Sequence, residues 1–531
     1  MRGAGFLAGV LVTYAWLFPW LPALRSPNEL SRLYQTRAIV DDHSLSVNQQ
    51  IARRGMVGDL SVKDGRYYPN KAPGLSFAAV PAYAALKLVR GGAEGVSDRA
   101  GIFFLRLLVC MVAGAIAAER MRRILLRRYG PPLALAGATI LALGTIMWPY
   151  STLFMSHGPA AAALVACWYY LDRAREHPDS PAPVRRGRMP HVLELVEVAR
   201  GNYALAGFFA GMALLFEYTS AVGLLALAAY GLAGARHKGR AAIHALAGFL
   251  PFALALGLYH RAAFGSAFAT GYAYLVNPTF QAWHGRGFLG VGAPSLGALV
   301  ASFVAPSRGL FAYSPFLALA LPGLWLLWQR DRALAMLSGS ALVLYGAFTA
   351  SYTFEAWGWT VGPRHITPLA AFLTPPAMEA AEWLRARGLG LFAAALALAS
   401  IGGMAVLMAA GPYLPEELSN PVHQLSLPLL AQGFHAHTLL GMLLHTASSW
   451  TLLPWLALLV PLGLRAALAF VPHGPSGVRN SSLAGAAALA SVLFLAGATV
   501  GGPDRYEGTR RFMEERWEPV AGNAPGVLAG P

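Results

Sequence analysis

GIFFLRLLVCMVAGAIAAERMRRILLRR, residues 101–128, decides the class of fold. It opens within an apolar run at 100–118, close to the 20 or so residues that a helix needs to cross a bilayer. Five arginines follow directly: Arg120, Arg122, Arg123, Arg127 and Arg128. An apolar run that ends in a basic cluster is typical of a membrane span that ends at the cytoplasmic surface.

The composition of the whole chain agrees with a membrane protein. Of its 531 residues, 56% are hydrophobic and only 12% are charged, whereas a soluble domain is about 45–50% apolar and about 25% charged. These values exclude an ordinary soluble enzyme and a disordered chain. Cys110 and Cys167 both fall in apolar runs, so we interpret them as small core residues and not as a disulfide or a metal site.

Apolar runs of spanning length recur along the chain, and we expect an all-α polytopic membrane protein with about thirteen transmembrane helices. The runs are residues 4–24, 100–118, 131–150, 157–171, 202–216, 219–234, 241–259, 310–328, 333–351, 365–383, 389–410, 450–468 and 482–500. The first run is interpreted as an uncleaved span, because it is long for the core of a signal peptide.

The run at residues 74–89 determines the orientation. If it crossed the membrane, the five arginines after residue 118 would lie outside, against the positive-inside rule. We therefore interpret it as an interfacial or juxtamembrane helix. The later basic clusters then also fall inside, and the N-terminus is cytoplasmic while the C-terminus is extracytoplasmic. The predicted outer loops are about 25–99, 260–309, 352–364 and 412–449.

An adjacent pair of carboxylates, Asp41 and Asp42, lies in the long first outer loop. Adjacent carboxylates repel each other, which favours keeping one basic or using both on a hard cation. A carboxylate near a reacting hydroxyl serves as a general base, so both are candidate catalytic residues and candidate ligands of a divalent metal. The alternative is structural, because Asp42 precedes SLSVNQQI and suits the N-cap of a helix. The spacing leaves both interpretations open.

The stretch GDLSVKDGRYYPNKAPG, residues 58–74, follows in the same loop. Its KDGR segment, ending at Arg66, predicts a tight turn between two short extended segments. Tyr67 and Tyr68 suit the membrane interface. Lys71 stands where the loop returns to the membrane surface, where an ammonium can hold a lipid-linked phosphate as a point charge. A lysine that only snorkels to the interface is the alternative.

Two arginines at the predicted outer surface precede spans directly. Arg308 lies in APSRGLF and Arg364 in WGWTVGPRHI. A guanidinium binds phosphate oxygens in a fork geometry. The positive-inside rule does not account for these two arginines, because it places basic residues on the cytoplasmic side. Anchoring to lipid headgroups is the alternative. Glu217 ends an apolar run at the same face and is either a functional acid or an interfacial carboxylate.

Four ordered stretches resemble the bacterial GT-C glycosyltransferases, the polytopic superfamily that includes the protein O-mannosyltransferases and the lipid A aminoarabinose transferases. They are the Asp41-Asp42 pair, DGRYYPNKAPGLS at 64–76, PSRGLFAYSP at 306–315 and WGWTVGPRH at 357–365. The resemblance covers roughly residues 1–380. It departs from the family pattern at Ala72, where a proline is usual, and at His365, where a tyrosine is usual.

The resemblance implies an activity and roles for these residues. A sugar carried on polyprenyl phosphate moves to an acceptor hydroxyl at the extracytoplasmic face of the bacterial inner membrane, in one inverting displacement. One aspartate of the pair acts as the base or as a metal ligand. Three cations neutralise the phosphate of the leaving lipid: Lys71, Arg308 and Arg364. Further candidates for the substrate site are Arg66, Tyr67, Tyr68, His365 and Glu217.

The expected organisation has three parts: a catalytic module at 1–384, further C-terminal helices at 385–500, and an outer tail at 501–531. The alternative function is a polytopic transporter or lipid flippase, but no internal repeat is visible and the candidate charges lie at the outer surface. The formal net charge of +16 divides between cytoplasmic arginines and a few outer cations. The expected partners are thus the bilayer, the lipid-linked sugar and an acceptor protein, lipid or glycan, and not nucleic acid.

Overall fold

The computed structural model describes residues 3–19, 26–176, 192–287, 290–352, 358–416, 418–471 and 476–498. Two segments with a predicted place in the topology lie outside the described residues. They are the basic inner loop at 177–191 and the outer tail at 501–531.

Helices make up nearly all of the described chain. The first part holds α1 (Gly3–Trp16), β1 (Leu17–Phe18), α2 (Pro27–Asp41), α3 (Asn48–Arg54), β2 (Leu60–Lys63), β3 (Arg66–Pro69), α4 (Gly74–Val89), α5 (Asp98–Leu105), η1 (Arg106–Met111) and α6 (Val112–Leu126). The middle part holds α7 (Pro131–Leu143), α8 (Met147–Thr152), α9 (His157–Glu176), α10 (Val192–Phe216), α11 (Ser220–Ala233), α12 (Lys238–Phe264), η2 (Gly271–Tyr274), α13 (Pro278–His284), α14 (Leu296–Phe303), α15 (Leu310–Tyr313), η3 (Pro315–Leu319), α16 (Ala320–Arg330) and α17 (Arg332–Ser351). The last part holds η4 (Arg364–Ile366), α18 (Thr367–Ala386), α19 (Gly390–Ala410), η5 (Val422–Ser426), α20 (Leu427–Ala431), β4 (His437–Thr438), α21 (Leu439–Leu444), η6 (Ser449–Leu452), α22 (Leu453–Leu468) and α23 (Ser476–Ala498).

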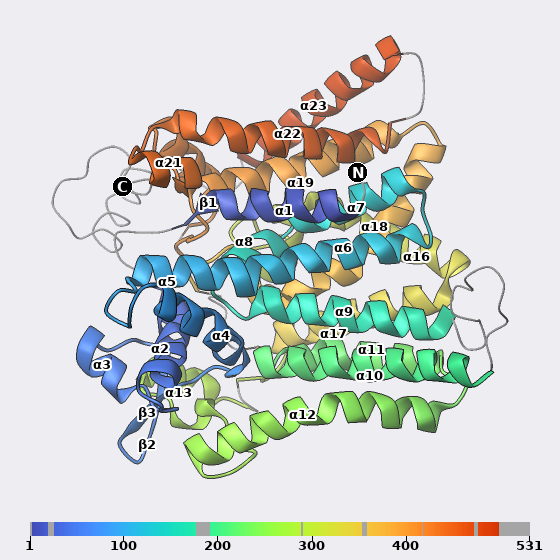
Figure 1. The fold of residues 1–531 in the computed structure, drawn as a ribbon. Helices are drawn as coiled ribbons and strands as arrows, with labels where there is room; N and C mark the ends of the chain where they lie inside the picture. Colours follow the sequence, from blue (N-terminus) through green and yellow to red (C-terminus); the bar gives the residue numbers. More distant parts are fainter. Residues whose placement is uncertain are drawn as a thin grey trace.

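The long helices run side by side in one bundle (Figure 1). Five helical stretches of the described chain are long and apolar enough to cross a membrane: Asp98–Leu126, Lys238–Phe264, Arg332–Ser351, Gly390–Ala410 and Ser449–Leu468. Each overlaps a predicted span, so the helical, polytopic class holds. The count of thirteen stays a prediction, because the remaining described apolar helices are shorter or interrupted.

Two of the expected spans are broken for a local reason. The run at 131–150 ends as α7 at Leu143, where Gly144 is the C-cap, and resumes as the short α8. The run at 310–328 divides into α15, η3 and α16. Pro315 has no backbone N–H to donate, and the chain forms a 3₁₀ turn there before α16 begins.

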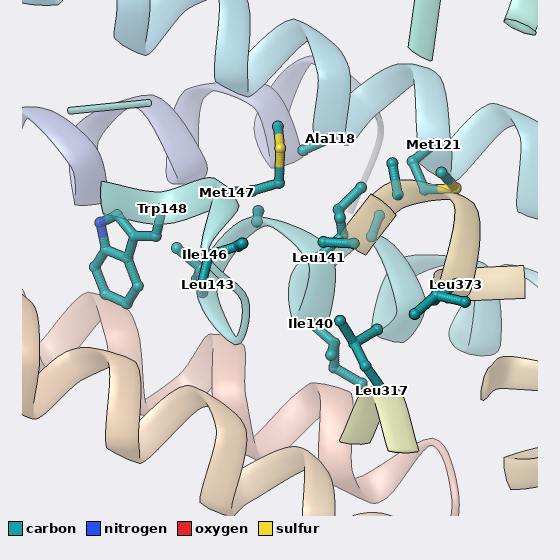
Figure 2. Packing of buried hydrophobic residues seen from close by; sticks show 14 of the residues in the cluster. Ala118, Met121, Ile140, Leu141, Leu143, Ile146, Met147, Trp148, Leu317 and Leu373 are labelled. Atoms are coloured by element: carbon teal, nitrogen blue, oxygen red, sulfur yellow. The ribbon is translucent and has the colours of Figure 1, made fainter. Parts of the chain in front are cut away.

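Figure 2 shows part of the main hydrophobic core, with side chains of α6, α7, α8 and α18 packed together. Trp148 of α8 is fully buried beside Ile146 and Met147, and Leu317 and Leu373 approach from later elements. Small residues elsewhere let helices pack closely, since a Cβ on Gly207 of α10 would lie 1.8 Å from the Ala245 carbonyl oxygen of α12. Cys110 and Cys167 are buried free thiols, as predicted.

Charged loops gather at opposite ends of the bundle. The helices α2, α3, α4 and α13 and the β2–β3 hairpin lie together at one end (Figure 1). The predicted inner segments contact one another through ion pairs. Arg128 pairs with Asp172 at 3.3 Å and with Asp331 at 3.2 Å. Arg330 pairs with Glu379 at 3.3 Å. The side of the membrane that each end faces remains a prediction.

The predicted turn in the first loop is confirmed. Strands β2 and β3 pair antiparallel with Lys63 opposite Arg66. The two turn residues, Asp64 and Gly65, have φ of 49° and 73°, as a two-residue hairpin requires when both central residues are left-handed. Helix α4 packs against α2, and its interfacial position stays a prediction.

Candidate functional site

A cavity of about 390 Å³ opens at the end of the bundle that carries the hairpin. Each predicted outer loop contributes to its wall. Asn28 and Asp59 come from the first loop, Trp283 from the second, Trp359 from the third and Glu416 from the fourth. The four segments that the charge rule predicts on one face of the membrane therefore form one site.

The hairpin brings a carboxylate and a lysine together in this site. Because Leu60 pairs with Pro69, the residues just beyond the strands also meet, and the Asn70 N–H donates to the Asp59 carbonyl oxygen at 3.3 Å. The next residue, Lys71, places its Nζ 3.6 Å from Asp59 Oδ1. The Tyr272 ring lies 5.6 Å from the same ammonium, which favours its charged form.

A buried chain of polar contacts continues from α2. Arg32 donates from Nη1 to the Asn28 carbonyl oxygen at 2.9 Å, one helical turn earlier, and from Nη2 to Ser156 Oγ at 2.8 Å. Ser156 in turn donates to Glu217 Oε2 at 2.6 Å. His157 Nδ1 lies 3.5 Å from the same oxygen. The segments that supply these groups are distant in sequence, so only the tertiary fold creates the chain.

Arg364 reaches the cavity because of a glycine-containing loop. Gly358 has φ of 78°, and a Cβ there would lie 2.8 Å from Arg364 Nη1. The loop is fastened where Tyr150 donates its hydroxyl to the Val361 carbonyl oxygen at 2.6 Å. Gly362, with φ of 64°, turns the chain into η4. Arg364 is thereby positioned on the cavity wall.

We name the five charged residues of this region the charge cluster: Arg32, Asp59, Lys71, Glu217 and Arg364. Three are cations and two are carboxylates. Of the five, Asp59 and Arg364 line the cavity, as does a further carboxylate, Glu416. Burial lowers the pKa of Lys71, and the Asp59 charge opposes that shift while the Arg364 charge adds to it. Burial also lowers the pKa of Arg32. Cations that are fixed and desolvated favour the binding of an anion.

Two donors of the charge cluster are unused within the described part of the chain. The buried Nε atoms of Arg32 and Arg364 have no hydrogen-bond partner among the described residues. An unsatisfied buried guanidinium N–H costs free energy. A ligand that accepts these hydrogens would recover that energy.

Several residues predicted from the sequence come together here. Lys71, Arg364 and Glu217 belong to the charge cluster, and His365 follows Arg364 with its ring 5.1 Å from the His157 ring. Arg308 lines an adjoining cavity that shares Thr360 and Glu416 with the first. Their roles in binding a donor stay proposals.

Arg66 and the hairpin residues Tyr67 and Tyr68 lie outside the cavity wall. Arg66 is exposed at the turn. Tyr67 uses its backbone, accepting from the Val47 N–H at 2.8 Å and donating to Asn48 Oδ1 at 2.8 Å. Tyr68 is buried, with its ring 5.5 Å from that of Phe264. None of the three lines the cavity.

The Asp41-Asp42 pair lies at the end of α2, within ion pairs. Asp41 contacts Lys87 Nζ at 2.8 Å and accepts from the Tyr83 hydroxyl at 2.9 Å. Asp42 contacts Arg53 Nη1 at 2.7 Å, and its side chain is only 1% exposed. Neither lines the cavity, and their catalytic role remains a prediction.

The alternative prediction, that Asp42 is the N-cap of a helix, is wrong. Asp42 is the C-cap of α2, and the N-cap of α3 is Val47, which makes no side-chain cap bond. Asp42 instead accepts from Gln50 Nε2 of α3 at 2.7 Å. It therefore ties the two helices together by side-chain contacts.

The tentative metal site has little support in the donor set. Among the described residues, no three His, Cys, Asp or Glu side chains are grouped closely enough to hold a metal ion. Asp41 and Asp42 each face a cationic partner. These residues do not fit a bound divalent metal, and we derive no step through one.

Sequence reasoning missed Asp59 and Arg32. Asp59 had a local signal, because it directly precedes an extended segment whose hairpin partner leads into Lys71. Arg32 had none, since its partners Ser156 and Glu217 are more than a hundred residues away. A buried arginine in a short helix of an outer loop cannot be distinguished from an exposed one by sequence pattern alone.

Comparison with known proteins finds matches at low identity among solved structures. No family model and no curated protein matches the chain. ArnT from Cupriavidus metallidurans, solved bound to undecaprenyl phosphate, is 15% identical with a TM-score of 0.49, covering 92% of this chain and 76% of that one. The arabinosyltransferase EmbB from Mycobacterium smegmatis is 14% identical with a TM-score of 0.42, covering 92% and 41%. The Archaeoglobus fulgidus oligosaccharyltransferase is 13% identical with a TM-score of 0.45, covering 81% and 55%. With every TM-score below 0.5, the function rests on the residues of the site.

Proposed function

We propose that this protein is an integral membrane glycosyltransferase that moves a hexosyl or pentosyl group from a polyprenyl-phosphate donor to an acceptor hydroxyl. The charge cluster beside the cavity carries the proposal. A sugar joined to a lipid through a phosphodiester brings one negative charge, which the cations of the cluster can bind. Cations fixed in a desolvated site bind such a charge far more strongly than they would in water.

The proposed step is one inverting displacement. The acceptor oxygen attacks the anomeric carbon while the bond from that carbon to the phosphate oxygen breaks, and the bonding electron pair leaves on the phosphate. The proton of the acceptor hydroxyl passes to a carboxylate. Lys71 and Arg364 stabilise the negative charge that develops on the leaving phosphate.

We assign the base to Asp59, because it lines the cavity and belongs to the charge cluster. Its carboxylate lies 3.6 Å from the Lys71 ammonium, so the proton acceptor and a phosphate-binding cation are adjacent. The sequence-based assignment to Asp41 or Asp42 stays a prediction that the same assay tests.

The proposal includes a place in the cell. We place the chain in the bacterial inner membrane with its N-terminus cytoplasmic and the cavity at the extracytoplasmic face. The lipid tail of the donor then lies against apolar faces of the bundle. Reporter fusions in the loops around Arg128 and Asp64 test this orientation, since only the second is expected to be extracytoplasmic.

The function is tested with the full chain reconstituted in lipid nanodiscs. Undecaprenyl phosphate carrying a radiolabelled sugar is supplied together with envelope lipids and proteins as acceptors, and released undecaprenyl phosphate and labelled product are both measured. We expect turnover by the wild type and its loss in Asp59→Asn. The matched control is Asp64→Asn, which changes an exposed aspartate in the same hairpin. Absence of both donor binding and turnover in the wild type would contradict the proposal, and movement of intact donor across vesicles without transfer would favour a flippase.

A further inference from the structure

The cavity has an aromatic wall that a phosphate does not require. Phe280, Trp283 and Trp359 line it together with Asp59 and Arg364. A phosphate needs cations and N–H donors, whereas flat rings bury the apolar surface of a ligand. The wall therefore indicates that a second part of the ligand, with an apolar face, lies beside the phosphate.

Local sequence explains how α13 presents this wall. Asn277 caps the helix, its Oδ1 accepting from the Thr279 and Phe280 N–H groups at 2.9 Å and 3.4 Å, and Pro278 suits the first turn. Residues three apart share a helix face, so Phe280 and Trp283 lie together. Their rings are stacked, with centroids 5.4 Å apart and planes at 30°.

The helix is held in a fixed place relative to the charge cluster. The Val276 N–H donates to the Leu60 carbonyl oxygen at 3.0 Å, directly after Asp59. On the other side, the His284 ring lies 4.5 Å from the Tyr272 ring, which in turn covers the Lys71 ammonium. These contacts connect the aromatic wall to the anion-binding residues.

We propose that Trp283, backed by Phe280, is the platform on which the sugar ring of the donor stacks. The inference rests on the proposed function and deepens it, because it assigns the sugar end of the ligand to α13. A pyranose or furanose ring has an apolar C–H face that fits an indole, while its hydroxyl groups project from the ring edge. Glu416, which lines the same cavity, supplies a carboxylate that accepts from those hydroxyls.

Two probes separate sugar binding from phosphate binding. The full chain in nanodiscs is titrated with undecaprenyl phosphate alone and with undecaprenyl phosphate carrying mannose, glucose or arabinose. We expect the wild type to bind at least one glycosylated probe more tightly than the bare lipid phosphate. Trp283→Ala is expected to lose that preference, by about tenfold, and to bind the bare lipid phosphate as the wild type does. Trp283→Phe retains a flat ring and is expected to stay within about threefold of the wild type.

Other results would overturn the inference. Equal weakening of both probes in Trp283→Ala would make the residue structural, and an unchanged preference would remove its role. A wild type that binds the bare lipid phosphate but prefers no glycosylated probe would also end the inference. A wild type that binds neither probe would instead contradict the proposed function itself. If Trp283→Ala fails to fold, Phe280→Ala removes the ring behind the platform and is judged by the same preference.

Discussion

Asp59 Oδ1 lies 3.6 Å from Lys71 Nζ, across the open ends of a two-stranded hairpin. The distance is too long for a strong hydrogen bond, yet it is short enough for each charge to influence the other. Because the two groups share no strong hydrogen bond, each of them can exchange the other for a ligand. We expect Lys71 to turn to the donor phosphate and Asp59 to the acceptor hydroxyl when substrates bind.

Three asparagine variants discriminate between the candidate bases. Asp59→Asn is expected to lower the rate of transfer by about 10²- to 10⁴-fold, the usual contribution of a general base. Asp41→Asn and Asp42→Asn are expected to keep the rate and to lower the thermal midpoint, because each removes a charge from an ion pair of α2. The rate constant at saturating donor is the measurement. Full activity in Asp59→Asn, with loss in either of the others, would return the base to the pair.

The lowered pKa of Lys71 predicts a pH dependence of donor binding. A phosphodiester keeps its single negative charge as the pH rises, whereas Lys71 loses its positive charge above its pKa. Burial lowers that pKa, so binding is expected to weaken at a lower pH than an exposed lysine, near 10.4, would allow. Lys71→Arg keeps the charge at every accessible pH and is expected to give a flat profile. Lys63→Arg in the hairpin serves as the control and should follow the wild type; identical profiles for Lys71→Arg and the wild type would exclude the lysine.

Arg364 and Arg66 form a matched pair of arginines, one on the cavity wall and one exposed at the hairpin turn. Arg364→Gln is expected to weaken binding of undecaprenyl phosphate by about 1.5–3 kcal/mol, the usual contribution of hydrogen bonds to a charged group. Arg66→Gln is expected to leave it unchanged. Arg308→Gln, in the adjoining cavity, tests the third cation of the sequence-based proposal. Isothermal titration gives the three values, and equal effects at Arg364 and Arg66 would point to a general surface charge effect.

A buried ion pair contacts Tyr413, which lines the cavity. Arg106 donates from Nε and Nη2 to the two carboxylate oxygens of Glu29, both at 2.9 Å, and Tyr413 donates to the same carboxylate at 2.8 Å. Both charged side chains are fully buried. Removing one partner leaves an uncompensated charge, so Arg106→Leu or Glu29→Leu is expected to cost about 3–5 kcal/mol.

The double variant Glu29→Leu with Arg106→Leu is expected to recover part of that loss, since it leaves neither charge buried alone. Thermal unfolding in detergent measures the series. Arg385→Leu, which breaks a partly exposed pair with Glu382, is the control and is expected to cost at most about 1 kcal/mol. Single variants as stable as this control would show that the buried pair is not needed for the fold.

Much of this protein follows from the sequence because the physics involved is local. The apolar run before Arg120 specifies a helix with an apolar surface, the KDGR segment specifies a two-residue turn, and both are confirmed. The four outer loops could be assigned to one face by counting arginines, and their residues do line one cavity. Breaks within α7–α8 and α15–α16 were not foreseen, since hydropathy alone does not register the glycine or the proline at which a helix is interrupted.

The site itself depended on the tertiary structure. The sequence shows that Asp41 and Asp42 are adjacent, but only the packing of the helices decides that each faces a cation of a neighbouring helix. Packing also decides that Arg32, Ser156 and Glu217 meet although they are far apart in the chain. Hydrophobicity and turn preference act over a few residues, and they determined that this is a helical membrane protein with charged loops. The position of one carboxylate relative to one cation depends on how several helices pack, so only the tertiary structure decided that Asp59, Arg364 and Glu416 line one cavity.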